Sequence, residues 1–409
     1  MNHEKASQIP WAIIAAAAIM AFALFSPIFG IPPIEHILKE EFSLSHAQTS
    51  LIYSGPVLMI AVISLPAGIL TDRIGIRKAA GIGAIILAIG SVLRLTANNP
   101  QSLIAFSFIY GVGVGWVFPN LPKLVSLWAP KHRAVSITAI YTVALYVGPA
   151  LALAITVPVM LATTGTYQVA FLLWSIPAII AAVMWWILVR EPTSQEPPSE
   201  NRVNNITKLR TVFSNANVWL LSIIAFFYFF FYYTWSGWAP TLLISKGASA
   251  SLAGLISSIT IWVGIPIVFL MPRLNTKLGL RKPFLWGPAV ACIIASLVVV
   301  RIGLSATWLP MVMVGIADGA IIVTLLILLV EIVDVKLVGI ATGVVWAISH
   351  GGGFIGPIIG GNILDTTGNL NLSYIILAII CSALVAVAFK LPETGPKASR
   401  ISTVESTNY

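Results

Sequence analysis

The sequence carries little charge for its length. Only 9% of its 409 residues are Asp, Glu, Lys or Arg, whereas 58% are hydrophobic. A soluble domain could not cover that much apolar surface with so few charged side chains, so the composition excludes a water-soluble globular protein. Many apolar runs reach the length of about 20 residues that a helix needs to cross the hydrocarbon core of a bilayer. The chain is therefore expected to be an all-α integral membrane protein.

Cysteine is also scarce, and its two positions argue against a disulfide or a metal pair. Cys292 and Cys381 each fall in the middle of an apolar run, where a cysteine acts as a small core residue. The sequence shows no nucleophile–base pair, no metal-ligand spacing and no nucleotide-binding motif. We therefore expect no catalytic residue, no metal, no cofactor and no enzymatic activity.

The formal net charge of +9 does not indicate nucleic acid as a partner, because no basic stretch is interleaved with base-stacking aromatic residues. With a cytoplasmic N-terminus, all but four of the 23 Lys and Arg residues fall on the cytoplasmic side. The four exceptions are Lys39, Arg94, Lys246 and Arg301. The positive-inside rule then predicts a multi-pass protein of the inner (plasma) membrane, in contact with lipids and with both termini cytoplasmic. No cleavage pattern precedes the first span, which is expected to be retained.

Breaks made by charge, Pro, Gly and Asn divide the chain into twelve expected spans. They cover residues 11–34, 48–70, 79–97, 101–127, 134–160, 168–189, 217–240, 249–271, 284–304, 307–331, 337–363 and 372–391. Between the sixth and seventh lies the polar, Pro-rich stretch "REPTSQEPPSENRVNNITKLR", which is typical of a linker. We expect an N-terminal six-helix bundle at 1–189, a cytoplasmic linker at 190–216, a C-terminal bundle at 217–391 and a cytoplasmic tail at 392–409.

What charge there is gathers in "GILTDRIGIRK", residues 68–78, between the second and third spans. A weaker copy, "PRLNTKLGLRK", occupies residues 272–282 between the eighth and ninth spans. The two copies lie 204 residues apart, and the same offset relates Gly115 to Gly319. Two parallel six-helix halves joined by a cytoplasmic linker are a known arrangement of transporter repeats.

"GILTDRIGIRK" resembles the loop 2–3 signature of the major facilitator superfamily, G-x-L-x-D-R-x-G-x-R-K. The resemblance implies twelve transmembrane helices in two pseudo-symmetric six-helix bundles, and a latch on the cytoplasmic side. The latch residues would be Gly68, Asp72, Arg73, Gly75, Arg77 and Lys78. The alternative is a positive-inside anchor without a gating role, which would require neither Asp72 nor the glycines. The second copy departs from the signature at Pro272 and Thr276.

A second motif, "GGGFIGPIIGG" at residues 351–361, resembles the glycine–proline motif that antiporters of this superfamily carry in span five. Here the full motif falls in span eleven, whereas span five has only "YVGPALA". Close packing of helix backbones through small residues explains either copy. We expect that packing role for Gly352, Gly356, Pro357, Gly360 and Gly361.

The branch of the superfamily is indicated by the run P-x-L-P-K-L-V at 119–125, which leads to W-x-P at the end of the helix. This run resembles the cyanate and nitroimidazole permease-like branch. The family resemblance also implies that spans one, four, seven and ten line a central cavity, with contributions from spans two, five, eight and eleven.

Polar and aromatic residues at helical spacing mark candidate substrate contacts on those spans. Each set shares one helix face, but an aromatic stripe can also be plain helix packing. The sets are Tyr228, Tyr232 and Trp235 in span seven; Trp116, Asn120 and Lys123 in span four; and Trp346 and His350 in span eleven.

Two ionisable residues lie near mid-span. Asp318 falls in the middle of span ten, where a carboxylate costs about 2.5–3.5 kcal/mol and is by default a functional candidate. His350 carries an imidazole, whose unperturbed pKa is near physiological pH. We expect Asp318, and second His350, to couple transport to protons or another ion, against the alternative that each only bonds a neighbouring helix.

No Lys or Arg is expected at mid-span, which favours a weakly charged solute or a small organic anion; Lys123 is the candidate for the latter. The leading interpretation is a monomeric secondary transporter of a small organic solute by alternating access, proton-coupled and acting as a symporter. The alternatives are a polyspecific exporter of lipophilic compounds and a nutrient sensor with a transporter fold. A sensor would be expected to carry a folded output domain, which the short linker and tail do not offer.

Overall fold

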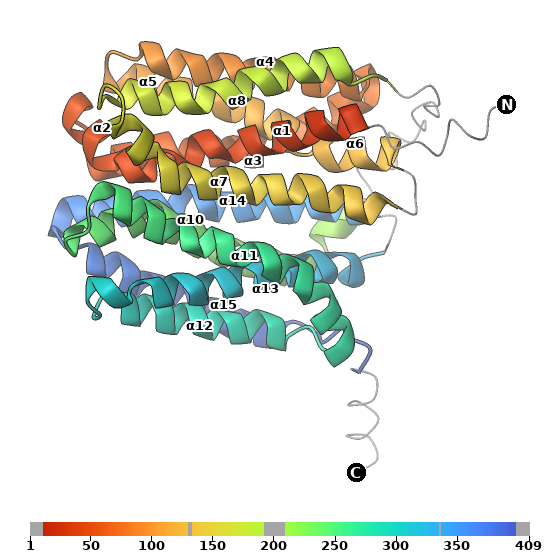
Figure 1. Ribbon diagram of the computed structural model, residues 1–409. Helices are drawn as coiled ribbons and strands as arrows, with labels where there is room; N and C mark the ends of the chain where they lie inside the picture. Colours follow the sequence, from red (N-terminus) through yellow and green to blue (C-terminus); the bar gives the residue numbers. More distant parts are fainter. Residues whose placement is uncertain (1–10, 130–132, 192–208, 335–336, 398–409) are drawn as a thin grey trace. The chain divides into compact units, whose positions relative to one another are not determined.

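The computed structural model is built of helices and describes residues 11–129, 133–191, 209–334 and 337–397 (Figure 1). Within them, eleven helical spans are long and apolar enough to cross a membrane, and a shorter apolar helix stands where the ninth span is expected. The first half contains α1 (Trp11–Phe29), α2 (Glu35–Phe42), α3 (His46–Ile74), α4 (Ile76–Leu93), α5 (Pro100–Val117), α6 (Asn120–Trp128), α7 (Ala134–Leu161) and α8 (Tyr167–Leu188). The second contains α10 (Ala216–Ser245), α11 (Ala250–Leu278), α12 (Pro283–Val299), α13 (Trp308–Ile332), α14 (Val338–Thr367) and α15 (Leu370–Lys390). Short 3-10 turns precede α2, follow α4 and precede α13.

The chain folds as two compact units. Unit one comprises Met1–Glu200 and Ser236–Ser258, and unit two comprises Asn201–Trp235 and Ile259–Tyr409. The division therefore falls inside α10 and α11. The bundle boundaries expected from the sequence stay predictions, and most of the linker and of the tail lies outside the described residues.

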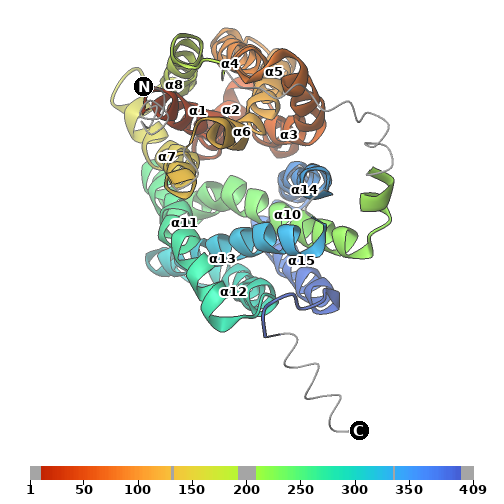
Figure 2. The same cartoon turned by 90° about the vertical axis from the view of Figure 1, so that its right-hand side faces the viewer.

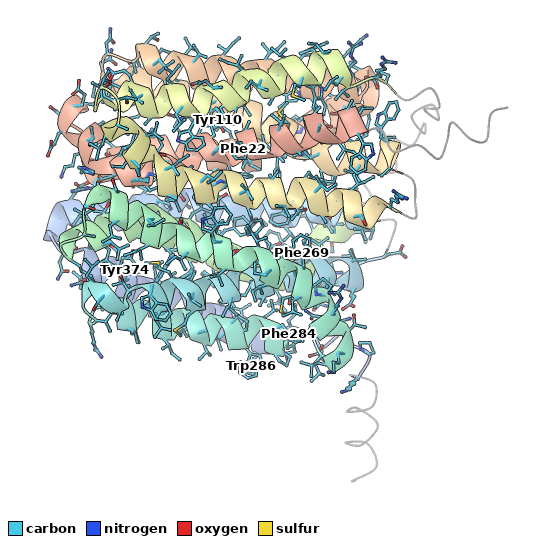
Figure 3. All side chains as sticks on the ribbon, in the orientation of Figure 1. Phe22, Tyr110, Phe269, Phe284, Trp286 and Tyr374 are labelled. Carbon is cyan, nitrogen blue, oxygen red and sulfur yellow. The ribbon has the colours of Figure 1, made fainter. Side chains whose placement is uncertain are left out.

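Each unit is a helical bundle with its own packing. In unit one, α5 packs against α3 and α4, and α1 packs against α7 and α8. Figure 2 shows these helices nearly end-on. In unit two, α12 packs against α13 and α15. Tyr110 (Figure 3) illustrates the interior of unit one: it is fully buried, and its hydroxyl donates to the carbonyl oxygens of Ala23 and Leu24 on α1.

The surface of α8 is apolar where a water-soluble helix would be polar. Residues three or four positions apart on one face are exposed, whereas the opposite face is buried. The exposed residues are Leu172, Ile176, Ile179, Ile180, Val183 and Ile187. The buried ones are Trp174, Ala178, Ala181 and Trp185. Such a stripe is stable against lipid chains and would be a liability in water.

The 204-residue offset seen in the sequence reappears as the same backbone contact in both units. A Cβ on Gly148 of α7 would lie 2.5 Å from the carbonyl oxygen of Phe22 on α1. A Cβ on Gly352 of α14 would lie 2.2 Å from the carbonyl oxygen of Phe226 on α10. Both members of the second pair stand 204 positions after those of the first. The missing side chains allow the two helix backbones in each pair to touch.

A second set of contacts follows the same offset. A Cβ on Gly111 would lie 2.5 Å from the Cα of Pro56, and one on Gly315 would lie 2.5 Å from the carbonyl oxygen of Thr260. These pairs join α5 to α3 and α13 to α11. The two halves therefore repeat one helix-packing plan, although few side chains are identical between them.

Candidate functional site

A buried carboxylate lies in the middle of α13, inside unit two. Asp318 is only 4% exposed, and the hydroxyl of Tyr228 on α10 donates a hydrogen bond to its Oδ1. Tyr228 itself is 3% exposed. An ionisable side chain in the middle of a transmembrane helix costs free energy, so such a residue usually has a functional role. The carboxyl group thus accepts a hydrogen bond from a neighbouring helix.

Aromatic rings from α10 and α14 cluster next to this pair. The ring of Tyr232 lies 6.1 Å from that of Tyr228, and the ring of Phe229 lies 5.4 Å from Trp346 and 4.9 Å from His350. The predicted residues Tyr228, Tyr232, Trp346 and His350 are thus brought together. We call these four residues, together with Asp318, Phe229 and Tyr233, the aromatic cluster of unit two.

Phe229 and Tyr233 belong to the cluster but were not predicted. Tyr233 contacts Phe229 and Tyr232 at centroid distances of 5.9 and 5.7 Å, and it interacts electrostatically with Asp318. Both residues lie one position after a predicted one, in the run "FFYFFFYYTW". In a stretch that is aromatic at nearly every position, helical spacing cannot single out one face.

His350 is held by its own helix. Its Nδ1 lies 2.7 Å from the carbonyl oxygen of Trp346, one turn earlier in α14, and the residue is 1% exposed. Since a carbonyl only accepts hydrogen bonds, Nδ1 carries the proton and donates it. The imidazole is therefore oriented within the cluster by the backbone of α14.

Trp235 does not join the other residues of its predicted stripe. It is fully buried, stacks on Phe231 at 5.7 Å and meets the ring of Tyr374 on α15 edge-on at 5.3 Å. Figure 3 labels Tyr374 within unit two. The side chain thus fills the space between α10 and α15. Trp235 follows Tyr228 by seven residues, which turn an α-helix by about 700°, so the two side chains differ by only about 20° around the helix axis. They lie two turns apart along α10, however, and therefore contact different neighbouring helices.

The span that carries Trp116, Asn120 and Lys123 is interrupted, which the spacing argument for one continuous helix did not anticipate. α5 ends at Val117 and α6 begins at Asn120. Pro119 has no N–H to donate, and the carbonyl of Gly115 instead accepts from the hydroxyl of Ser64 on α3 at 3.2 Å. The carbonyl of Trp116 accepts from the side-chain amide of Asn120 at 2.8 Å.

The three predicted residues of this span consequently have different surroundings. The Trp116 side chain lies against Gly83 of α4, and Asn120 is 1% exposed and bonded to its own backbone. Lys123 Nζ lies 2.5 Å from Asp72 Oδ1 at the end of α3. All three residues belong to unit one, whereas the aromatic cluster belongs to unit two.

Loop 2–3 is fastened to the end of α8. Gly75 ends α3 with φ +85°, a value that favours glycine, and the backbone N–H of Arg77 donates to Glu191 Oε1 at 2.8 Å. The Arg77 guanidinium donates to the carbonyl of Trp186 at 2.8 Å. Of the other predicted latch residues, Arg73 and Lys78 are exposed, and a Cβ on Gly68 would meet no atom within 4 Å.

The second copy of the loop is built in the same way. Gly279 has φ +66°, and the backbone N–H groups of Arg281 and Lys282 donate to the carboxylate of Glu393 at 2.6 and 3.1 Å. The Arg281 guanidinium also binds Glu331 at the end of α13, at 2.8 Å. Glu393 therefore has the same role after the twelfth span as Glu191 has after the sixth.

The glycines of the span-eleven motif lie where α14 meets its neighbours in unit two. Besides Gly352, a Cβ on Gly356 would lie 2.3 Å from Thr234 Oγ1 and 2.6 Å from the carbonyl oxygen of Phe230. Pro357, Gly360 and Gly361 are buried, and the carbonyl of Gly360 accepts from Ser373 on α15 at 3.2 Å.

No described residue offers an unpaired buried cation for a strongly anionic solute. Arg94 is 1% exposed, but its guanidinium lies between the rings of Tyr110 and Phe171, at 4.5 and 5.3 Å, and donates to the carbonyl of Pro27. Lys123 is paired with Asp72. No group of three or more His, Cys, Asp or Glu within the described ranges could hold a metal ion.

The described part of the chain forms twelve apolar helices in two bundles that repeat one packing plan, with a buried carboxylate among aromatic rings. These features define a multi-pass membrane transporter fold. A family model described as Major Facilitator Superfamily matches residues 11–357 and again residues 247–408. The chain belongs to the major facilitator superfamily. It is a secondary transporter of small solutes and not an enzyme, since its relatives are named as transporters.

Relatives and solved structures agree with this assignment. The chain is 25% identical to the uncharacterized transporter YycB of Bacillus subtilis (strain 168), over 92% of each chain. It is 22% identical to the cyanate transport protein CynX of Escherichia coli (strain K12), over 69% of each, and 24% identical to the 2-nitroimidazole transporter of the same organism, over 66% and 67%. A bacterial homolog of the human lysosomal transporter Spinster, solved inward-facing and unoccupied, matches with a TM-score of 0.76 at 17% identity, over 94% of this chain and 97% of that one.

Proposed function

We propose that the chain is a proton-coupled transporter of one small, weakly charged organic solute or small organic anion, with both termini in the cytoplasm. The observation that carries the proposal is the buried Asp318–Tyr228 hydrogen bond in the middle of unit two. A carboxyl group that gains and loses a proton there would change the charge of the site during the cycle. Alternating access by rocking of the two repeats then couples that proton to the solute.

The aromatic cluster supports the solute class. Sites for small molecules are mostly apolar with a few oriented polar groups, and the cluster combines ring faces with the hydroxyls of Tyr228, Tyr232 and Tyr233. The cations Arg94 and Lys123 are already engaged, which disfavours a solute that needs a full countercharge. We therefore infer selection by shape and hydrogen bonding, with Trp346 and His350 at the edge of the site.

The experiment is uptake into proteoliposomes under an imposed pH gradient. The solutes to be tried come from the relatives' names, namely cyanate, 2-nitroimidazole, a hexuronate and tartrate. We expect one of them to be driven by the gradient in wild type and to lose that response in Asp318→Asn. Tyr228→Phe should alter the pH profile of uptake, because the ring remains and only the donor to Asp318 is lost.

Tyr374→Phe is the matched control, since it removes a buried tyrosine hydroxyl that has no hydrogen-bond partner among the described residues. It should leave the gradient response unchanged. A response that persists in Asp318→Asn would move the coupling site elsewhere, with His350→Gln as the next variant. Rates that ignore the gradient in every protein would instead indicate a uniporter or another coupling ion.

A further inference from the structure

A compact set of titratable side chains lies at the end of unit one opposite to loop 2–3. His46 begins α3, whereas loop 2–3 follows the other end of the same helix. Glu35 and Lys39 lie one turn apart on α2, the short helix that precedes it. Glu35 is 4% exposed, and its Oε2 is buried with no hydrogen-bond partner among the described residues. This cluster of three residues is separate from the aromatic cluster of unit two.

The hydrogen bonds of the cluster fix the protonation state of the imidazole. Lys39 Nζ lies 2.6 Å from His46 Nε2, and His46 Nδ1 lies 2.7 Å from Glu35 Oε1. A lysine ammonium can only donate, and lysine keeps its proton far above the range in which histidine titrates. Nε2 therefore accepts from Lys39, and Nδ1 donates to Glu35. The arrangement requires a neutral His46.

The other face of this cluster is covered by the part of the chain that follows Trp235. The ring of Trp238 on α10, which is 2% exposed, meets the imidazole of His46 at a centroid distance of 5.8 Å and an angle of 65°. One residue earlier, a Cβ on Gly237 would lie 2.9 Å from the ring of Tyr53, two turns along α3. Gly237 and Trp238 thus contact α3, and all of these residues belong to unit one. We call these two contacts the α3–α10 seam.

We propose that His46 is a proton-operated latch: the α3–α10 seam is closed while the imidazole is neutral and opens when it binds a proton. A protonated ring has no acceptor left for Lys39, so that two positive charges would face each other beside one carboxylate. The site is too enclosed for water to screen them well, because the His46 and Glu35 side chains are 15% and 5% exposed. Separation of α3 from α10 lets water reach both cations.

The charged side chains that bond to the His46 ring lie on α2. α2 contributes Glu35 and Lys39, whereas α10 presents the uncharged Trp238; the nearest charged residue along that segment is Lys246, eight positions on. In the proposed orientation of the chain, with both termini cytoplasmic, the His46 latch lies on the outer side of the membrane. An acidic exterior would then favour the form of the protein that is open to it, and the proton would act before any event at Asp318.

The test measures the opening of the α3–α10 seam without any solute. Ser236 directly precedes the seam residues Gly237 and Trp238 and is 3% exposed. Its hydroxyl has no hydrogen-bond partner among the described residues, so Ser236→Cys is a mild reporter. Its labelling by a polar maleimide in lipid nanodiscs is compared with that of the exposed Ala162→Cys at each pH, above the background of the two buried native cysteines. We expect the ratio of the two rates to rise roughly tenfold from about pH 7.5 to about pH 5.5, as a minor open state becomes the main one.

The variants separate His46 from general effects of acid. In His46→Gln, which keeps polar atoms but cannot titrate, the ratio should stay flat. His36→Gln is the matched control, because it removes a half-buried histidine on α2 that is not part of the cluster, and it should respond like wild type. Lys39→Met should weaken the response, because protonation of His46 then no longer places two cations together. This variant also tests the proposal if His46→Gln folds poorly.

A flat ratio in wild type, or a rise that persists in His46→Gln, would overturn the latch. If the rise in the labelling ratio is lost in His36→Gln but retained in His46→Gln, the pH response belongs to His36 and the proposal for His46 is wrong. Because neither a solute nor a gradient is used, the result is independent of whether Asp318 couples transport.

Discussion

Lys123 Nζ lies 2.5 Å from Asp72 Oδ1, and this ion pair joins α6 to the last turn of α3. The Asp72 side chain is 67% exposed and that of Lys123 is 32% exposed. A pair so open to solvent contributes about 0–1 kcal/mol to stability, so a structural role does not explain it. The pair also engages the ammonium group of Lys123, which was predicted from the sequence as the contact for an anionic solute.

Asp72→Asn is therefore expected to slow transport while the protein remains folded. The change removes the charge that holds Lys123 but costs little stability, so thermal unfolding should move little while uptake falls. Lys123→Gln should slow uptake to a similar extent, and the double variant should be no worse than either, because all three break one interaction. Normal uptake by a stably expressed Asp72→Asn protein would remove the latch role of loop 2–3.

Lys123→Ala, compared with Asp72→Asn, tests Lys123 as a solute contact. If Lys123 binds an anionic solute, Lys123→Ala should weaken its binding through lost attraction, whereas Asp72→Asn should leave it unchanged or improve it. Binding of each candidate solute by the purified variants, measured calorimetrically, distinguishes the two outcomes.

Variants of Trp235 and Tyr232 should distinguish a role in protein stability from a role in solute binding. Trp235 is fully buried between Phe231 and Tyr374, so Trp235→Ala leaves a cavity and should cost about 3–5 kcal/mol of stability. Tyr232 is half-buried at the edge of the aromatic cluster, so Tyr232→Ala should weaken solute binding by about 1–3 kcal/mol with a smaller loss of stability. Melting temperature and solute affinity are measured for both. A large loss of affinity in a stable Trp235→Ala protein would restore Trp235 to the site.

Glu393 and Glu191 are expected to stabilise their units in the same way. Glu393→Ala leaves the N–H groups of Arg281 and Lys282 without their charged acceptor, and Glu191→Ala does so for Arg77. A hydrogen bond to a charged group contributes about 1.5–3 kcal/mol, so both variants should melt at lower temperature. Glu40→Ala, which removes an exposed acid on α2, is the control. Equal melting of all three proteins would show that the carboxylates do not hold the loops.

Much of this fold could be predicted because membrane spans are governed by length and hydropathy. Expected and observed helices differ by a few residues at most ends, and the family resemblance and the offset of 204 residues predicted the repeat. The contacts that realise the repeat could not be predicted. Gly148 against Phe22 and Gly352 against Phe226 depend on which backbones approach, and the sequence only shows that glycines are present.

The candidate site was predicted less completely, for two physical reasons. Pro119 interrupts the fourth span, so spacing across it does not define one face. In α10, consecutive aromatic residues hide the difference between Trp235, which packs on Tyr374, and Phe229, which contacts His350. Asp318 was predicted because a charge in an apolar run stands out, but its partner Tyr228 was predicted only as a solute contact. Lys39 and His46 carried no sequence signal, since they lie near helix ends where charge is common.

The close approach of α14 to α10 gives a last prediction. A Cβ on Gly352 would lie 2.2 Å from the carbonyl oxygen of Phe226, a backbone atom that cannot turn aside. Gly352→Ala must therefore push the two helices apart, and it should lower both the melting temperature and the rate of uptake. Gly339 lies on the same helix with nothing within 4 Å of its Cβ position. Gly339→Ala should be neutral or stabilising by up to about 1 kcal/mol, because alanine favours the helix.

Gly148→Ala extends the comparison to the first repeat, where a Cβ would lie 2.5 Å from the carbonyl oxygen of Phe22. If one packing plan serves both units, Gly148→Ala and Gly352→Ala should destabilise the protein to a similar extent, measured as loss of melting temperature in the same lipid. A protein that tolerates Gly352→Ala as well as Gly339→Ala would mean that α14 and α10 can separate freely. The glycine motif would then lose its packing role, and a direct role in solute passage would have to be tested instead.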